Sequence, residues 1–240
     1  MSIDSSRPLQ IGGILFPQMD QADFTGPFEV LSRIPNSRFH VIASDKAPIR
    51  DAKGLILTPE TTFATAPQLD LLLVPGGFGV DVLMEDQSTL GFIREQAKNA
   101  KFVLSVCTGA LVLGAAGLLT GRRATTHWAS FHLLQYFGAL PVKARVVHDR
   151  EGRIVTTAGV TAGIDGALRV VSLLRGDAAA QEIQLYMQYA PEPPFNSGIP
   201  ETAPPEIVAA SRAGFQARID ARLAIVKRVA SHSAPKDERA

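Results

Sequence analysis

Short runs of hydrophobic residues alternate along the chain with longer stretches in which hydrophobic residues recur at helical spacing. The runs typical of buried strands cover residues 11–16, 39–43, 69–74 and 102–106. The stretches typical of helices follow three of these runs and cover residues 23–31, 81–100 and 108–117. Strands that alternate with helices predict an α/β protein with a mainly parallel sheet flanked by helices.

The pattern is weaker in the connections and in the second half of the chain. Residues 49–58, with Gly54 in their middle, favour a hairpin, and Pro27 suits the first turn of the first helix. Further strands are predicted at residues 123–126, 145–147 and 154–157, and further helices at 162–174 and 178–189.

The character of the chain changes at Ala190, where a proline-rich stretch begins that cannot form regular structure. An amphipathic helix is predicted beyond it, because hydrophobic residues return at helical spacing at Val208, Phe215, Ile219, Leu223 and Val226. We therefore divide the chain into an α/β domain, residues 1–190, and an arm with a helix, residues 191–240, that packs on the body or on a second subunit. Its interleaved basic residues are interpreted as a solvated face: Arg212, Arg218, Arg222 and Lys227.

Composition narrows the class of protein. The 240 residues are 46% hydrophobic and carry a formal charge of +1, which gives no global field for nucleic acid or an anionic membrane. The longest near-apolar stretch, residues 110–119, is too short to span a bilayer, and the first residues lack the basic segment and apolar run of a signal peptide. We expect a cytoplasmic protein.

Cys107 is the only cysteine, so the chain can form no internal disulfide and no cysteine cluster for zinc. It lies where a predicted strand turns directly into a predicted helix, in the sequence Ser105-Val-Cys-Thr-Gly109. Such an elbow exposes a nucleophile at the carboxyl edge of a sheet and needs small residues two positions before and after it. The start of the helix favours an anion and is expected to lower the pKa of the thiol. The alternative is a buried structural cysteine.

Other residues would complete a site around Cys107. Gly76 and Gly77 follow the preceding strand, and their N–H groups, with that of Thr108, are candidates for an oxyanion hole rather than a plain turn. Asp23 opens the first helix and is either an N-cap or an acid beside the thiol. In the second case repulsion raises the pKa of one group or the other and couples their titrations.

His127 lies 20 residues after Cys107 and has two interpretations, a general base or a structural histidine (127 − 107 = 20). His132 follows five residues later, which is poor spacing for shared helical metal ligation (132 − 127 = 5). No metal is expected.

Three motifs, taken together, carry a family resemblance: Phe102-Val-Leu-Ser-Val-Cys-Thr-Gly, Val74-Pro-Gly-Gly and Ala124-Thr-Thr-His-Trp. The chain resembles the ThiJ/PfpI superfamily over residues 9–174, which implies a flavodoxin-like fold of the class I glutamine amidotransferase type. Members include peptidases, glyoxalase-like enzymes, chaperone-like proteins and domains of transcription regulators, so the fold alone does not define the function.

A closer resemblance, to the isocyanide hydratases, rests on further motifs that extend into the arm: Asp23-Phe-Thr-Gly-Pro, Thr157-Ala-Gly-Val-Thr-Ala-Gly-Ile-Asp and Tyr189-Ala-Pro-Glu-Pro-Pro-Phe-Asn. It implies that Cys107 attacks an isocyanide with the help of Asp23 and Thr108. It also implies a homodimer without metal or organic cofactor, and a pocket lined by Gly159 and Val160. His127 matches the histidine of the superfamily and is a second-rank candidate for the site.

Two alternatives remain open at the level of sequence. One is a cysteine-dependent glyoxalase-like or amidase-like hydrolase with His127 as the base. The other is a protein without catalysis, either a redox sensor in which Cys107 is oxidised or the ligand-sensing module of a regulator.

Overall fold

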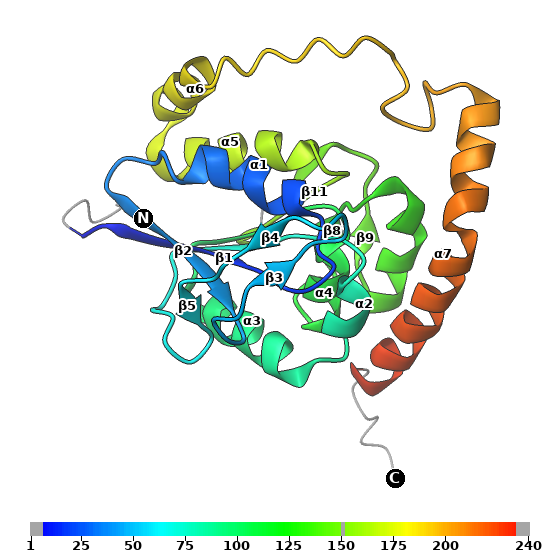
Figure 1. The fold of residues 1–240 in the computed structure, drawn as a ribbon, viewed down its shortest axis with the longest axis horizontal. Coiled ribbons are helices and arrows are strands. Elements are labelled where there is room, and N and C mark those ends of the chain that lie inside the picture. The colour runs from blue at the N-terminus through cyan, green and yellow to red at the C-terminus, as the bar shows by residue number, and fades with distance from the viewer. Residues whose placement is uncertain (1–6, 150–151, 234–240) are drawn as a thin grey trace.

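A seven-stranded sheet forms the centre of the molecule, with the strand order β10-β11-β7-β6-β1-β2-β5 (Figure 1). The computed structural model describes residues 7–149 and 152–233. The strands are β1 Leu9–Ile14, β2 Ser37–Ala43, β5 Thr61–Thr62, β6 Leu71–Val74, β7 Phe102–Ser105, β10 Val146–His148 and β11 Ile154–Thr157. All neighbours in the sheet are parallel except β10 and β11. The predicted α/β class is confirmed.

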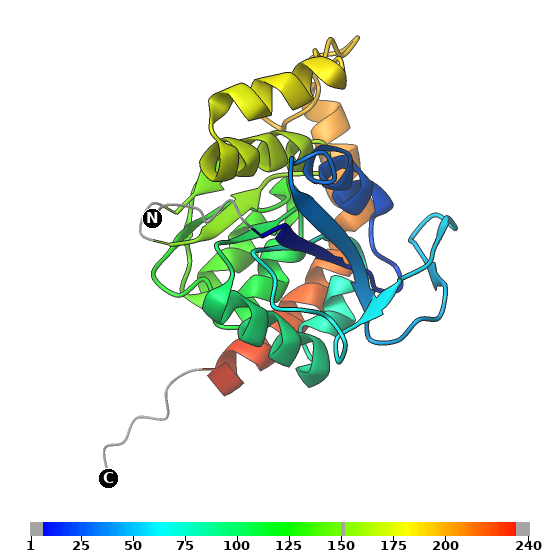
Figure 2. The same ribbon diagram turned by 90° about the vertical axis from the view of Figure 1, so that its left-hand side faces the viewer.

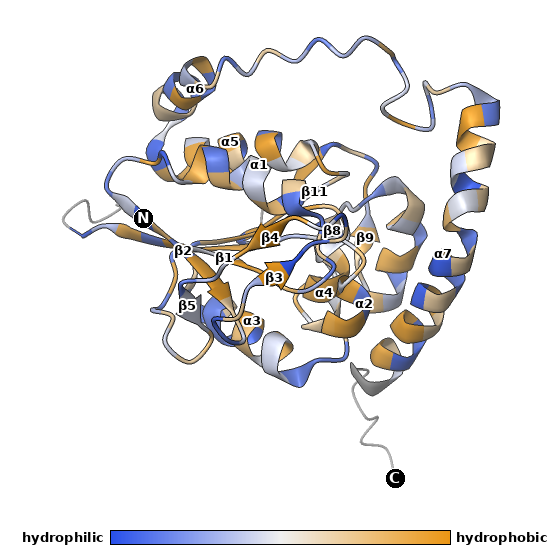
Figure 3. Ribbon diagram, viewed as in Figure 1, coloured by the Kyte–Doolittle hydropathy of each residue, from blue (hydrophilic) through white to orange (hydrophobic). Residues whose placement is uncertain are grey.

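Helices cover both faces of this sheet. On one face lie α1 (Gln21–Leu31) and α5 (Ala162–Arg175), and on the other lie α3 (Gln87–Asn99) and α4 (Gly109–Ala115) (Figures 1 and 2). Strand β6 is buried along its whole length, which explains its unbroken apolar run, and Figure 3 shows the central strands as mostly hydrophobic. Strand β11 is buried as completely, although its second half consists of Thr156 and Thr157.

Two details of the predicted helices are wrong. The helix expected over residues 81–100 is divided into α2 (Val80–Leu83) and α3, because the Asp86 carboxylate caps α3 by accepting the N–H groups of Ser88 and Thr89. Pro27 lies inside α1 rather than in its first turn, since the helix already begins at Gln21.

Small elements surround the main sheet. The predicted hairpin is confirmed as β3 (Ile49–Arg50) paired with β4 (Ile56–Leu57). The strand expected at residues 123–126 is only β8 (Arg123–Ala124), which pairs with β9 (Leu140–Pro141) outside the main sheet. The 3₁₀ helix η1 (Trp128–Phe137), which follows it, was not predicted.

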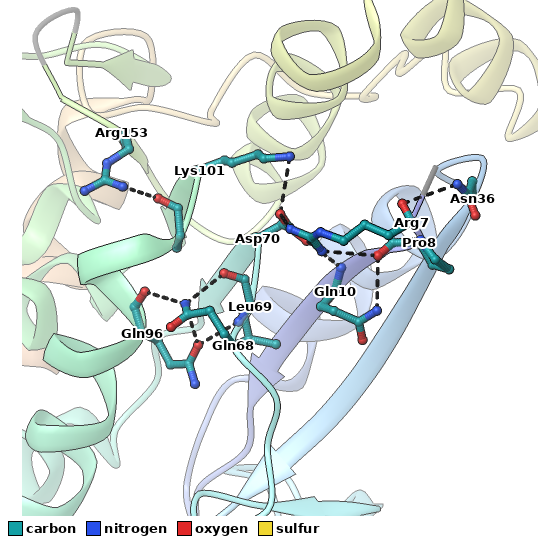
Figure 4. Close-up of polar contacts among 11 residues, drawn as sticks. Arg7, Pro8, Gln10, Asn36, Gln68, Leu69, Asp70, Gln96, Lys101 and Arg153 are labelled. Atoms are coloured by element: carbon teal, nitrogen blue, oxygen red, sulfur yellow. Dashed lines mark hydrogen bonds and ion pairs between the residues drawn. The ribbon is translucent and has the colours of Figure 1, made fainter. Parts of the chain in front are cut away.

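A polar network fixes the amino ends of the central strands, away from the carboxyl edge (Figure 4). The buried carboxylate of Asp70 accepts hydrogen bonds from Arg7 at 2.8 Å and from the N–H of Gln10 at 2.9 Å, and Lys101 lies 3.3 Å away. Burial raises the pKa of Asp70, but these three partners together hold it below its usual value. The charged carboxylate of Asp70, which directly precedes β6, therefore holds β1 through the N–H of Gln10.

The C-terminal part leaves the body and returns to it. After α6 (Asp177–Tyr186) the chain has no regular structure until α7 (Pro205–Ser233), which lies at the other side of the molecule (Figure 1). Helix α7 packs against η1 and α4, and Val226 is fully buried there. The expected solvated basic face is wrong at Arg222, which is only 5% exposed. Within residues 7–149 and 152–233 no helix is long and apolar enough to cross a membrane.

Candidate active site

The candidate site lies at the carboxyl edge of the sheet, where four neighbouring strands end. Strand β1 leads to α1 and Asp23, β6 leads to Gly76 and Gly77, and β7 leads to Cys107. Strand β11 ends just before Ala158, whose carbonyl accepts the N–H of Cys107 at 2.9 Å. Because β11, β7, β6 and β1 are adjacent and parallel, these loops converge on one place, as open α/β folds place their ligand sites.

Cys107 occupies the predicted elbow. Its φ of 55° is in the left-handed region, which costs a residue with a side chain free energy and is held here by the surrounding structure. The N–H of Cys107 donates to Ala158, and its carbonyl accepts the Thr126 hydroxyl at 2.7 Å. The predicted need for a small residue two positions later is confirmed, because a Cβ on Gly109 would lie 2.3 Å from the carbonyl oxygen of Val74.

Asp23 is fully buried in the first turn of α1. Its Oδ2 accepts the N–H of Gly76 at 3.0 Å, whereas its buried Oδ1 has no hydrogen-bond partner among the described residues. The N-cap interpretation is wrong, since Asp20 caps the helix by accepting the N–H of Ala22. Burial, with the nearby charge of Asp20, raises the pKa of Asp23 to about 8, so this carboxyl group is protonated at neutral pH.

Burial also raises the pKa of the Cys107 thiol well above its usual value, and the charge of Asp23 adds to this effect. The N–H of Thr108 at the start of α4 acts in the opposite direction. The expectation of a lowered thiol pKa is therefore wrong in its net result, because burial outweighs the helix start. The expected coupling is confirmed, since Asp23 and Cys107 each influence the other's pKa. At neutral pH the pair consists of a thiol and a carboxylic acid.

The two glycines after β6 hold the groups around the sulfur. The N–H of Gly77 donates to the Thr108 hydroxyl oxygen at 3.0 Å, and the same hydroxyl group lies 3.1 Å from the carbonyl of Gly77, to which it donates. A Cβ on Gly76 would lie 2.8 Å from Asp23 Oδ2. The expected oxyanion hole is thus corrected for Gly76 and Gly77, whose N–H groups are already used by Asp23 and Thr108. Of these three N–H groups, the one that acts on the sulfur is that of Thr108.

The segment that follows β11 runs beside the backbone of Cys107 and the ring of His127. Gly159 and Val160 are partly buried and lead into α5, and a Cβ on Gly159 would lie 3.1 Å from Cδ2 of His127. The structure thus places Gly159 between the Cys107 backbone and the His127 ring.

His127 is the N-cap of η1, and its Nδ1 accepts the N–H of Ala129 at 3.3 Å. Its ring packs against Trp128 and Phe215. Burial and the charge of Arg222 lower the pKa of His127, so the ring is neutral at neutral pH. In the described part of the chain no hydrogen bond joins His127 to Cys107, which favours the structural interpretation of this histidine.

A cavity of about 240 Å³ opens beside the loop that carries Gly77. It is lined by Asp20, Gln21, Asp51, Ala52, Lys53, Leu55, Gly77 and Phe78. Gly77 belongs both to this wall and to the hydrogen bonds around Thr108, whereas Cys107 and Asp23 are not among the residues that line the cavity.

Sequence reasoning missed two residues of this site. Asp20 lines the cavity and acts on the pKa of both Asp23 and Cys107; its position as a polar residue just before a helix was the signal that would have found it. Arg222 was assigned to a solvated face, and nothing in its local pattern distinguishes it from the other arginines of α7.

Comparison with known proteins agrees with this fold. Residues 11–173 match the model of the DJ-1/PfpI family, and the chain belongs to that family. The superfamily resemblance read from the motifs is therefore confirmed.

Individual relatives give a finer picture. The chain is 52% identical over 223 residues to the isonitrile hydratase of Pseudomonas putida, which covers 93% of this chain and 97% of that protein. The crystal structure of a ThiJ/PfpI family protein from Pseudomonas syringae superimposes with a TM-score of 0.88 at 38% identity, over 91% of this chain and 90% of that one. The HTH-type transcriptional regulator CdhR of Pseudomonas aeruginosa is 27% identical over 71% of this chain and 52% of its own length.

Proposed function

We propose that this protein is a cysteine-dependent hydro-lyase that hydrates isocyanides, also called isonitriles, to N-substituted formamides. The observation that carries the proposal is the buried pair of Cys107 and Asp23, in which a protonated carboxyl group lies beside the only thiol. Similarity to an isonitrile hydratase over nearly the whole of both chains supports the choice of substrate class.

The first step forms a covalent adduct. The terminal carbon of R–N≡C accepts a soft nucleophile and must gain a proton as the new bond forms. Because burial keeps Cys107 as a thiol, its proton has to leave during the attack. One oxygen of the Asp23 carboxyl group gives its proton to the carbon while the other oxygen takes the thiol proton. The S–H bond breaks, S–C and C–H bonds form, and the product is a thioimidate, R–N=CH–S–Cys107.

The second step hydrolyses the thioimidate and regenerates the free enzyme. Asp23 donates its proton to the thioimidate nitrogen and removes a proton from a water molecule that attacks the carbon. The tetrahedral intermediate collapses, the C–S bond breaks, and Asp23 passes the hydroxyl proton to the departing sulfur. The products are R–NH–CHO and the free thiol, so one water is consumed and both groups recover their protons.

The surrounding residues orient this pair. The N–H of Gly76 fixes Oδ2 of Asp23, the oxygen that takes the thiol proton, while the unpartnered Oδ1 carries the proton that the carbon receives. Thr108 stabilises negative charge on the sulfur through its N–H group, while its hydroxyl group is held by Gly77. We propose that Gly159 and Val160 line the side of the pocket opposite Gly77. His127 has no part in proton transfer in this scheme.

We also propose that the protein is a homodimer. Large hydrophobic side chains at the end of α6 and on the arm are exposed in the single chain: Leu185, Tyr186, Phe195 and Ile199, at 81%, 74%, 78% and 53%. Exposed apolar side chains that gather on a connection without regular structure are more stable when a partner covers them. Two copies related by a twofold axis would each cover the arm of the other.

The direct test is an assay of formamide. The protein is incubated with one aryl and one alkyl isocyanide, and the formamide is quantified by liquid chromatography and mass spectrometry. We expect the wild-type chain to convert at least one of them, Cys107→Ala to convert neither, and His127→Ala to stay within about threefold of wild type. Conversion by Cys107→Ala at the wild-type rate would refute the mechanism. Inertness toward both isocyanides, combined with His127-dependent consumption of methylglyoxal, would favour the hydrolase instead.

A further inference from the structure

Arg222 is a buried arginine that connects the C-terminal helix to the loop of the active site. It lies on α7 and is 5% exposed, although Ala221 before it and Ala224 after it are exposed. A buried guanidinium loses its hydration and is tolerated only when its N–H groups are paired. The hydrogen-bond partners of Arg222 therefore indicate which elements this buried charge connects.

Each nitrogen of the guanidinium has a different partner. Nε pairs with the carboxylate of Asp81 on α2, and Nη1 donates to the Ser130 hydroxyl of η1 at 3.1 Å. Nη2 donates to the carbonyl oxygen of Gly77 at 3.4 Å. The planar fork thus joins α7, α2 and η1 to the loop after β6, which a point charge on a flexible stem does not do.

The carbonyl of Gly77 is also the acceptor of the Thr108 hydroxyl group. The same two-residue loop presents the Gly77 N–H to Thr108 and the Gly76 N–H to Asp23. The guanidinium therefore shares the Gly77 carbonyl with the Thr108 hydroxyl group, and the N–H that holds Asp23 belongs to the preceding residue of the same loop. Arg222 contacts neither Asp23 nor Cys107 in the hydrogen bonds of the described residues.

We propose that Arg222 is a positioning residue, which fixes the Gly76-Gly77 loop from α7 and thereby holds Asp23 and Thr108 in place around Cys107. For turnover this inference rests on the proposed function, whereas for the reactivity of Cys107 it stands without it. Helix α7 then positions residues of the active site, in addition to packing on η1 and α4.

The chain offers a matched control on the same helix. Arg228 also ties α7 to the body, through the carboxylate of Glu85, but this ion pair is half-exposed and far along the helix from Gly77. Arg228→Met removes one arginine and one ion pair without touching the loop. Arg222→Met removes the fork, and the milder Arg222→Lys keeps a charge beside Asp81 but cannot reach three partners at once.

The experiment compares these variants with wild type at a temperature at which circular dichroism shows every one to be folded. Alkylation of Cys107 by iodoacetamide at pH 7.5 is followed by intact mass, and formamide production is measured with the best isocyanide. Release of the loop opens the site, so we expect alkylation to become at least fivefold faster in Arg222→Met while kcat falls at least tenfold. Arg222→Lys should move both quantities in the same directions by less, and Arg228→Met should leave both within twofold of wild type.

Other results would overturn the proposal. If both Arg222 variants match wild type in alkylation and turnover, the guanidinium does not position the loop. If Arg228→Met changes both quantities as much as Arg222→Met does, the effect is general loosening of α7. If wild type does not hydrate isocyanides, the proposed function fails, and the alkylation rates alone still decide whether Arg222 holds the loop.

Discussion

Asp23 and Cys107 are two ionisable groups that the fold removes from water and places beside each other. In water a carboxyl group of this type loses its proton near pH 4, so it would be useless as an acid at neutral pH. Burial reverses this, because the ionised form loses its hydration while Oδ1 gains no donor in return. Because burial disfavours the ionised carboxylate, Asp23 stays protonated and is the acid that the proposed chemistry requires.

This argument predicts the pH dependence of turnover. The acid form of Asp23 is present below its pKa of about 8 and is lost as the pH rises through that value. We therefore expect kcat/KM for isocyanide hydration to be constant from about pH 6 to 7 and to fall tenfold per pH unit well above 8. A rate that rises steadily from pH 7 to pH 10, as for a free thiolate, would contradict the assignment of Asp23 as the acid.

The same burial predicts a stability that depends on pH. The pKa of Asp23 is about 8 in the folded protein against 3.8 as the usual value, so the folded state binds the extra proton between these limits. The stabilisation from this proton is complete below pH 3.8 and is lost as the pH rises through 8. Asp23→Asn avoids the loss, so we expect it to be more stable than wild type by roughly 1–4 kcal/mol at pH 7.

Urea unfolding of Asp23→Asn and wild type at pH 4.5 and pH 7.5 measures this difference. The two proteins should be nearly equal at the lower pH and diverge at the higher one. At the same time Asp23→Asn should lose at least 100-fold in kcat, because a neutral amide cannot exchange protons. A variant that is less stable than wild type at pH 7.5 would show that Asp23 is ionised in the folded state.

At the scale of residues, the sequence indicated which side chains lie together in the site. It did not indicate how burial changes their pKa values. Cys107 and Asp23 were found from a strand-to-helix turn and from a motif, both of which are local in the chain. The net rise of the thiol pKa depends on burial by elements far apart in the sequence, so the local argument from the helix start predicted the wrong direction. Arg222 was misassigned for the same reason.

At the scale of elements, the elbow depends on the close approach of the start of α4 to the end of β6. Gly109 lies so near the Val74 carbonyl that any side chain would push the helix and strand apart. Gly91 in α3 has open space around its Cα, so it provides the matched control.

We expect Gly109→Ala to lower the free energy of unfolding by about 1–3 kcal/mol or more, as overpacking usually does. Gly91→Ala should instead raise it by about 0.5–1 kcal/mol, because alanine is the better helix residue. Chemical denaturation of both variants checks the pair of signs. Equal effects of the two substitutions would mean that the elbow is not held as tightly as its geometry indicates.

The main strands and helices of the α/β domain followed from hydrophobic periodicity because their burial is nearly complete. The wrong predictions have separate causes. A side-chain cap at Asp86 divides one predicted helix, and η1 is a 3₁₀ helix without the period of an α-helix. The sequence around β8 is typical of a strand, but the structure pairs it with β9 outside the main sheet. This pairing depends on tertiary contacts.

At the scale of the whole molecule, α7 and the arm extend the protein beyond the family domain. The arm reaches from α6 to the far side of the body (Figure 1), and its Phe195 is 78% exposed in the single chain. The sequence predicted a helix that packs on the body or on a second subunit, and in the single chain α7 contacts η1 and α4 of the body. Whether the arm also covers a second subunit remains a proposal.

Sedimentation equilibrium tests that proposal. We expect a mass of about twice the 25.7 kDa of the chain. The double variant Leu185→Ser with Phe195→Ser should dissociate at least tenfold more readily, because two large apolar side chains leave the interface. Glu192→Ser, on the same arm, is the control that removes no apolar surface. A monomer at all concentrations up to 100 μM would contradict the dimer (a concentration at which interfaces of ordinary affinity are occupied).

The covalent adduct is the central claim, and rapid quenching measures it most directly. Wild-type protein is mixed with excess isocyanide, quenched within one turnover and analysed by intact mass and by peptide mapping. The account predicts a gain equal to one isocyanide on Cys107, which decays at the rate at which formamide appears. Formamide that accumulates at the wild-type rate in Cys107→Ala, with no adduct in wild type, would contradict it.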